Sequence, residues 1–130
     1  MKLEELMLGD IIIAPFYGDM VPVKVVGLKD YIMYEPLDPG PHKKGPYLSR
    51  GDNVVPFTLW AATFAKNGWK VTTKPKVMAT LYAGRPVPVY LRWYEENKAL
   101  IIGKSLFPTP ICNLHQLQHI LSLLNIDFNI

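Results

Sequence analysis

Twelve of the 130 residues are proline, and they are spread between residues 15 and 110. Proline lacks a backbone N–H and its ring clashes inside a helix, so it belongs in loops and at strand edges. Long helices are therefore disfavoured over most of the chain. The sequence predicts short strands joined by turns, with few helices.

Residues 1–56 have the pattern of a small antiparallel sheet. The segments "IIIAPFY", "MVPVKVVGL" and "YIMYEPL" are apolar or alternating, and the turn signals "GD", "YGD" and "KD" separate them. Successive strands with tight turns predict a strongly bent sheet of SH3-like or partly open barrel type. Residues 38–53 contain three prolines and three glycines and predict a long loop, which is either functional or merely mobile.

Residues 57–130 begin with a helix in "VVPFTLWAATFAKNGW", where Thr58 is the expected N-cap and Gly68 the left-handed residue after the helix. The segments "VTTKPKVMATLY", "VPVYLRWY" and "KALIIG" predict further antiparallel strands. In residues 87–94, Val87, Val89, Leu91 and Trp93 alternate with Pro88, Tyr90, Arg92 and Tyr94. One face of this strand should therefore pack, and the other should show aromatic rings and a charge.

A C-terminal helix is expected from the Asn113 cap to a point near Asn125. At 100° per residue, one side collects an apolar stripe of Leu114, Leu117, Ile120, Leu121 and Leu124. This stripe should be the buried side. The complete prediction is one α+β domain of 130 residues: bent sheet, middle helix, second antiparallel hairpin section and C-terminal amphipathic helix.

Composition narrows the class of protein. Apolar residues make up 49% of the chain, which is enough for a packed core, and the net charge of +3 permits an acidic partner without requiring one. The single cysteine cannot form an internal disulfide, and the N-terminus has acidic residues where a secretory signal would be basic. We expect a cytoplasmic protein with no membrane association. The sequence does not specify an oligomeric state.

The string "CNLHQLQH" contains the only cysteine and two of the three histidines, four residues apart. The spacing of His115 and His119 suits two metal ligands on one helix, but neither a carboxylate nor a closed set of four ligands accompanies them. A solvated polar face is the favoured interpretation, with Cys112 as an inert thiol. We expect no metal, no cofactor and no catalytic residue here. Four residues are instead expected to dock the helix: His115, Gln116, Leu117 and Gln118.

Three segments together carry a family resemblance: "KLEELMLGDIII", "VVPFTLWAATFAKNGW" and "ICNLHQLQHILSLLNIDFNI". They resemble a family of small uncharacterised proteins of gut Bacteroidetes and their prophages and mobile elements. Its members share an "L-R-I-G-N-Y-V" start, a "P-[IL]-x-L-T-E-E-x-L…N-G-F" middle and a "Y-V-H-Q-L-Q-N-L-Y-F-A-L-T-G" end. His119 replaces an asparagine of that pattern, and Leu59-Trp60 replaces its pair of glutamates. The resemblance implies an origin and a layout and no reaction.

Three classes of function compete. The favoured one is a small non-enzymatic binding module that acts on an unknown protein partner. Its candidate interaction loop comprises His42, Lys43, Lys44, Tyr47 and Arg50. The alternative is a single-stranded nucleic-acid-binding accessory protein, because residues 66–92 carry six cations and no acid. The aromatic residues interleaved with these cations are Trp69, Tyr82, Tyr90, Trp93 and Tyr94. The candidate binding residues for nucleic acid are Lys70, Lys74, Lys76, Arg85, Arg92, Tyr90 and Trp93. A metal-dependent enzyme is least favoured, because no motif for catalysis is present.

Overall fold

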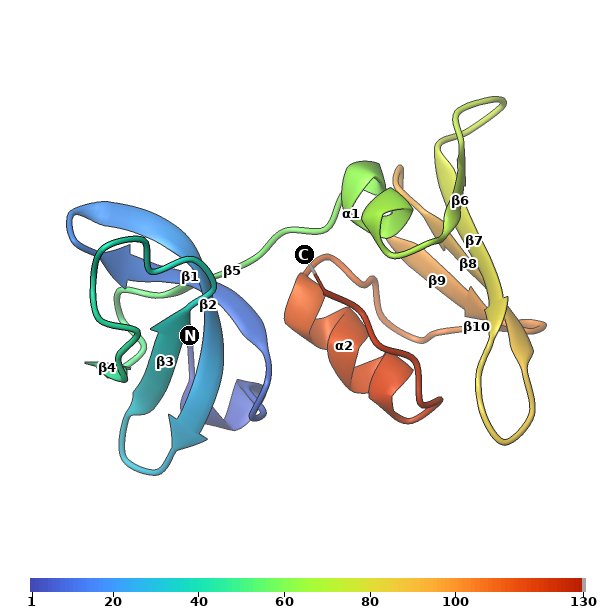
Figure 1. Ribbon diagram of the computed structural model, residues 1–130. Coiled ribbons are helices and arrows are strands. Elements are labelled where there is room, and N and C mark those ends of the chain that lie inside the picture. The colour runs from blue at the N-terminus through green and yellow to red at the C-terminus, as the bar shows by residue number, and fades with distance from the viewer. Residues whose placement is uncertain (130) are drawn as a thin grey trace. The chain divides into compact units, whose positions relative to one another are not determined.

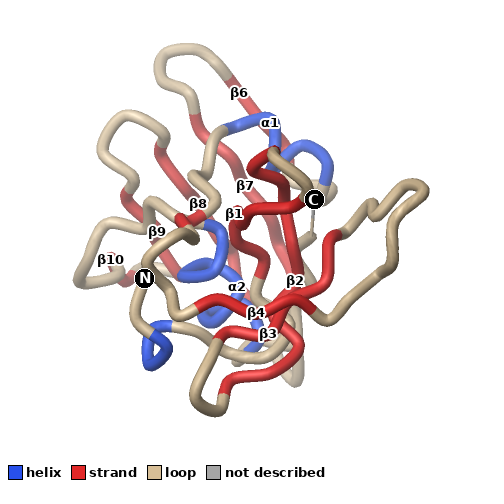
Figure 2. The backbone as a smooth tube through the Cα atoms, turned by 90° about the vertical axis from the view of Figure 1, so that its left-hand side faces the viewer, coloured by secondary structure: helices blue, strands red, loops and turns tan. Residues whose placement is uncertain are grey.

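The computed structural model describes residues 1–129. Its contacts divide the chain into two compact units, Met1–Phe57 and a second that begins at Thr58. Each unit has its own five-stranded antiparallel sheet (Figure 1). The predicted α+β class is confirmed. Little of the chain is helical (Figure 2), as its proline content predicts.

The sheet of the first unit has the strand order β4-β3-β2-β1-β5. Its strands are β1 (Ile11–Phe16), β2 (Asp19–Leu28), β3 (Ile32–Pro36), β4 (Tyr47–Ser49) and β5 (Val55–Pro56), and a short 3-10 turn, η1 (Leu3–Glu5), precedes them. Tyr17 and Gly18 join β1 to β2 with φ values of 49° and 88°. Two successive positive φ values match the right-handed twist of a hairpin, so the turn brings β1 and β2 into register.

Side chains of one face of this sheet, together with Leu6 and Val54 from outside the strands, form the core of the first unit. The buried residues in this core are Leu6, Ile12, Ala14, Val23, Val25, Ile32, Tyr34 and Val54. A register shift between Val25 and Gly27 bends β2 against β3, as a β-bulge does. Among the described residues β4 and β5 do not pair with each other, so the sheet is not a closed barrel. The expected loop 38–53 is interrupted, because β4 pairs with β3.

The second unit places two helices on one side of its sheet (Figure 1). The sheet has the order β10-β9-β8-β7-β6. Its elements are α1 (Ala61–Lys66), β6 (Lys70–Thr72), β7 (Met78–Ala83), β8 (Val89–Tyr94), β9 (Ala99–Ile102), β10 (Ser105–Leu106) and α2 (Leu114–Ser122). No helix within residues 1–129 combines the length and the hydropathy that a lipid bilayer requires of a spanning segment.

Helix α1 begins later than expected and has a distant cap. Thr58 is not its N-cap, because Thr58 forms a β-bridge with Asn113 and the N-cap position falls at Trp60, which supplies no capping bond. The Ala61 N–H instead donates to Glu95 Oε1 at 3.0 Å, from the turn between β8 and β9. After the helix, Gly68 has φ +80°, as predicted.

Aromatic rings form the packed layer between α1 and the sheet. Phe64 of α1 stacks on Trp93 of β8 with centroids 4.5 Å apart, and Trp69 and Phe128 meet Phe64 edge to face. Trp93 Nε1 donates to the Ile111 carbonyl at 3.0 Å, so its one polar atom is satisfied while the ring is fully buried. This layer fixes which face of β8 points away from the helices.

Helix α2 begins where the sequence predicts. Asn113 is its N-cap, and Gln116 Oε1 accepts the Asn113 N–H at 3.1 Å in a capping box. Leu114, Leu117 and Leu121 are fully buried, which confirms the centre of the apolar stripe. The helix has nine residues and is shorter than predicted, because the chain turns after Ser122 and reaches Asn125 at φ +57°.

Candidate functional site

Alternation along the strands of the second sheet separates a packed face from an open face. Leu91 and Trp93 are fully buried, whereas Tyr90, the residue before Leu91, is exposed. The strand register extends this division across all five strands. We call the side away from the helices the open face. Its members are Lys70, Thr72, Met78, Thr80, Tyr82, Tyr90, Arg92, Tyr94, Ala99, Ile101 and Leu106.

Rings and cations occupy neighbouring rows of the open face. Tyr82 and Tyr90 are opposite each other in the β7–β8 register and are 68% and 45% exposed. The next row runs from Lys70 through Thr80 to Arg92. The Arg92 guanidinium lies 5.9 Å from the centroid of the Tyr90 ring, at the outer limit of a cation–π contact. The open face therefore combines flat apolar surfaces with positive charge.

Carboxylates are absent from the strands that form this surface. The sequence has no acidic residue between Lys66 and Arg92, and the residues after Arg92 on β8 are Trp93 and Tyr94. An ion pair of the second unit joins Lys76 to Glu96, at 3.5 Å between exposed side chains. Arg92 Nε is buried and has no hydrogen-bond partner in the described chain. The charges of Lys70 and Arg92 are thus not neutralised by any described carboxylate within 4.0 Å.

The other predicted nucleic-acid-binding residues lie at the margins of the open face or away from it. Lys74 and Lys76 lie in the loop between β6 and β7, at one end of the sheet, and Arg85 lies in the loop between β7 and β8, at the other. The Arg85 N–H donates to the Leu124 carbonyl at 2.9 Å, which ties that loop to the end of α2. Trp93 is a correction: it lies on the packed face, because neighbouring strand residues point to opposite sides.

Two tyrosines of the open face were absent from the predicted set. Tyr82 and Tyr94 share the face of Tyr90. The alternation in residues 87–94 already indicated Tyr94, whereas Tyr82 required the β7–β8 register. Trp69, also interleaved with the cations in sequence, is 4% exposed and belongs to the aromatic layer.

In the first unit, the predicted interaction loop meets the β1–β2 turn in an aromatic cluster. We call Phe16, Tyr17, His42 and Tyr47 the loop cluster. His42 stacks on Tyr17 with centroids 3.7 Å apart and an interplanar angle of 11°. Phe16 meets the rings of Tyr17, His42 and Tyr47 edge to face. Tyr17 is 62% exposed despite these contacts, so the loop cluster presents a ring to solvent.

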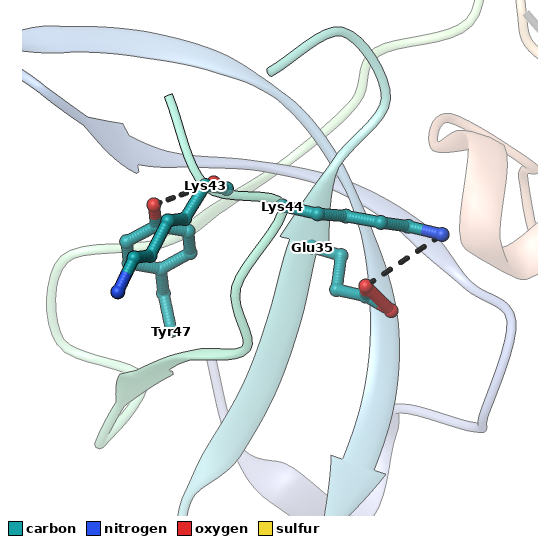
Figure 3. A network of polar contacts seen from close by, with 4 residues as sticks. All are labelled: Glu35, Lys43, Lys44 and Tyr47. Atoms are coloured by element: carbon teal, nitrogen blue, oxygen red, sulfur yellow. Dashed lines mark hydrogen bonds and ion pairs between the residues drawn. The ribbon is translucent and has the colours of Figure 1, made fainter. Parts of the chain in front are cut away.

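Polar contacts hold the loop beside this cluster (Figure 3). The Tyr47 hydroxyl donates to the Lys43 carbonyl at 2.7 Å, and the Lys44 ammonium lies 3.8 Å from a Glu35 carboxylate oxygen. Desolvation, with a further contribution from the neighbouring Tyr17 hydroxyl, raises the pKa of Tyr47 above its ordinary value. The sequence grouped Arg50 with these residues, but its guanidinium lies over the Tyr31 ring, 5.7 Å from the centroid.

The side chains of the "CNLHQLQH" string make structural contacts within the second unit. His115 is 5% exposed, so the expected solvated face is wrong for this residue. Gln116 was expected to dock the helix onto a strand. Its side-chain Oε1 instead accepts the backbone N–H groups of Cys112 and Asn113 at the start of α2. Gln118 Nε2 donates to the Phe128 carbonyl at 2.9 Å and holds the C-terminal segment. Within residues 1–129 no group of three or more histidine, cysteine or acidic side chains could hold a metal ion.

A comparison of the chain with protein-family models, with curated proteins and with solved structures found no match.

Proposed function

We propose that this protein is a non-enzymatic binding module and that the open face of its second sheet binds single-stranded nucleic acid. The observation that carries the proposal is the juxtaposition of Tyr82 and Tyr90 with Lys70 and Arg92 on one open face. Rings stack on bases of any sequence, and cations follow the phosphates. The lack of acidic residues along the strands supports this ligand over a cationic one.

The dimensions of the open face support a short segment of nucleic acid. Strands β7 and β8 have six residues each, so the face is roughly 20 Å long. Single-strand-binding domains of small size cover about four nucleotides or more. Lys74 and Arg85 lie at opposite ends of the sheet, where they extend the positive charge beyond the rings. A segment that runs along β7 and β8 would meet the tyrosine rings between the cations of the two end loops.

The test is fluorescence anisotropy with a labelled single-stranded oligonucleotide of mixed sequence, titrated at low and moderate salt. Tyr90→Ala should weaken binding about 5- to 150-fold, the equivalent of about 1–3 kcal/mol for one stacked base. Arg92→Gln should weaken binding and reduce the slope of log K against log salt by about 0.7, the contribution of one phosphate contact on a single strand. Arg50→Gln, the matched control in the first unit, should change neither quantity.

Two results would contradict the proposal. One is no binding of the wild-type protein at low salt. The other is binding that Tyr90→Ala and Arg92→Gln leave unchanged, because the open face would then make no contact with the oligonucleotide. A Tyr31→Ala control distinguishes a specific loss from the general effect of deleting an exposed ring, since Tyr31 is 38% exposed and lies in the first unit.

The loop cluster favours a second candidate function, the recognition of a protein partner. The observation that supports this candidate is the exposed ring of Tyr17. The His42 ring stacks on it, and the Phe16 ring meets it edge to face. Rigid aromatic side chains are frequent hot spots of protein interfaces, because they offer a large contact area at a small entropic cost. Chemical cross-linking in the native host, followed by mass spectrometry, tests this proposal. A genuine partner should be lost with Tyr17→Ala and retained with Tyr82→Ala.

The origin and location of the protein are part of the proposal. The resemblance of three segments to proteins of gut Bacteroidetes and their mobile elements supports an accessory role in such an element. The single cysteine supports the cytoplasm as its location. The strand order of the first unit, with β5 paired to β1, supports an SH3-like relationship for that unit.

A further inference from the structure

A hollow of about 500 Å³ lies at one end of the open face. Its apolar lining comes from adjacent strands of the sheet: Met78, Tyr94, Ala99, Ile101 and Leu106. Thr72, Pro75, Lys76, Glu96 and Asn97 complete the lining, and the last four come from the two loops at this end of the sheet. A volume of this size is within the range of small-molecule sites.

One of the strand positions that line the hollow, Ala99, has a small side chain. Ala99 is opposite Tyr94 in the β8–β9 register, and Tyr94 is opposite Met78 in the β7–β8 register. Met78, Tyr94 and Ile101 line the hollow with larger side chains, whereas the side chain of Ala99 ends at Cβ. An apolar recess with a tyrosine ring at its side therefore opens next to the cationic row.

The hollow is continuous with the surface proposed to bind nucleic acid. Tyr90, Arg92 and Tyr94 point to the same side of β8, and successive positions on one side of a strand are about 7 Å apart. A strand of nucleic acid that stacks a base on Tyr90 and places a phosphate at Arg92 would reach the hollow with a later base. The hollow is thus placed to receive one base at the end of the bound segment.

The polar groups of the hollow can distinguish among bases. Glu96 has a carboxylate that accepts hydrogen bonds and is partnered by the Lys76 ammonium at 3.5 Å. Asn97 Oδ1 accepts the Ala99 N–H at 3.3 Å, and its amide nitrogen donates to no described residue. A carboxylate next to an amide donor suits a base that has an exocyclic amino group beside a ring nitrogen acceptor, as cytosine and adenine do. Thymine and uracil would place a carbonyl oxygen against the carboxylate.

We propose that the hollow is a nucleobase subsite that selects an amino base, cytosine or adenine, at one end of the bound single strand. The inference rests on the proposed function of the open face. In this arrangement the base lies against Tyr94 and Met78, its amino group donates to Glu96, and Asn97 donates to its ring nitrogen. The rings and cations of the rest of the open face bind without regard to sequence.

The test compares all-thymidine oligonucleotides with the same oligonucleotides that contain one cytidine or adenosine near either end. The amino base should tighten binding about fivefold or more from one of the two ends, as a single specific base contact does. Ala99→Leu fills the hollow and should abolish this preference while binding of the all-thymidine strand persists. Ala65→Leu adds the same volume on the exposed side of α1 and should leave the preference intact.

A second variant keeps the test decisive if Ala99→Leu fails to fold. Glu96→Gln retains the size of the side chain but removes its charge, and it should reduce the preference for the amino base several-fold. In wild-type protein labelled with ¹³C at methionine methyl groups, the Met78 signal should shift more with the cytidine-containing strand than with the all-thymidine strand.

Each outcome separates this proposal from the one it rests on. If no oligonucleotide binds at low salt, both proposals fail together. If oligonucleotides bind through Tyr90 and Arg92 but all bases are equivalent, or if Glu96→Gln and Ala99→Leu leave a preference unchanged, the subsite alone is refuted. A preference that both variants remove, with all-thymidine binding retained, supports the subsite.

Discussion

Glu95 offers a sharp test of how the second unit is assembled. Helix α1 is only six residues long and has no capping side chain of its own, so the Glu95 carboxylate from the β8–β9 turn accepts the Ala61 N–H at 3.0 Å. The bond is partly buried and charge-assisted, and it fixes the helix that presents Phe64 to Trp93. Loss of a helix cap costs about 0.5–2 kcal/mol, and a negative charge at a helix start adds about 0.3–1 kcal/mol.

We therefore expect Glu95→Ala to lower the free energy of unfolding of the second unit by about 1–2 kcal/mol. Its sequence neighbour provides the control. Glu96 pairs with Lys76 while both side chains are mostly exposed, and such pairs contribute little. Glu96→Ala should change the free energy of unfolding by less than about 0.5 kcal/mol. Glu95→Gln, which keeps a carbonyl acceptor without the charge, should fall between these two variants.

Tryptophan fluorescence during urea unfolding is the appropriate assay. All three tryptophans, Trp60, Trp69 and Trp93, belong to the second unit, so their signal reports on that unit alone. In thermal unfolding, 1 kcal/mol corresponds to about 4–8 °C for a unit of this size. An equal decrease in the free energy of unfolding for Glu95→Ala and Glu96→Ala would refute the reasoning, because the two adjacent carboxylates would then contribute equally to stability despite their different contacts.

Three further predictions follow from the packing and the titratable groups. Leu117→Ala should cost about 2–5 kcal/mol, since its side chain is fully buried, whereas Leu123→Ala, at a position that is 82% exposed, should leave the tryptophan-monitored urea midpoint nearly unchanged. Burial raises the pKa of the Tyr34 hydroxyl in the folded protein. The contribution of this protonated hydroxyl to the free energy of unfolding should be complete below its pKa in the unfolded chain, about 10, and should decline as pH rises through its pKa in the folded protein. Circular dichroism melts between pH 9 and 11.5 should show this decline, and Tyr34→Phe should reduce it; an equal slope in the variant would contradict the assignment. Equimolar zinc should not shift the melting temperature of the wild type relative to a Cys112→Ala, His119→Ala variant, because no described cluster can complete a metal site.

Local chemistry made several elements predictable from sequence. The turn at Tyr17 and Gly18, the Asn113 cap with Gln116 three residues later, and the left-handed Gly68 each depend on residues close in the chain. The two faces of β8 were predictable for the same reason, because alternation is a property of one strand.

The short strands could not be predicted in this way. β4, β5 and β10 have two or three residues each, which is too few for a period, and each forms because a longer strand provides hydrogen-bonding partners. The loop that contains Tyr47 therefore appeared longer in sequence than it is.

The amino-acid sequence by itself determined that this protein is an α+β chain of short strands, with an amphipathic C-terminal helix and a β8 that has one packed and one aromatic face. Only the tertiary structure decided that Tyr82 joins Tyr90, that Ala99 and Tyr94 line a hollow, and that Glu95 caps a helix more than thirty residues earlier. The reason is physical: turns, caps and alternation act between neighbours in the chain, whereas a shared face, a recess and a distant cap require strands to pair in one particular register.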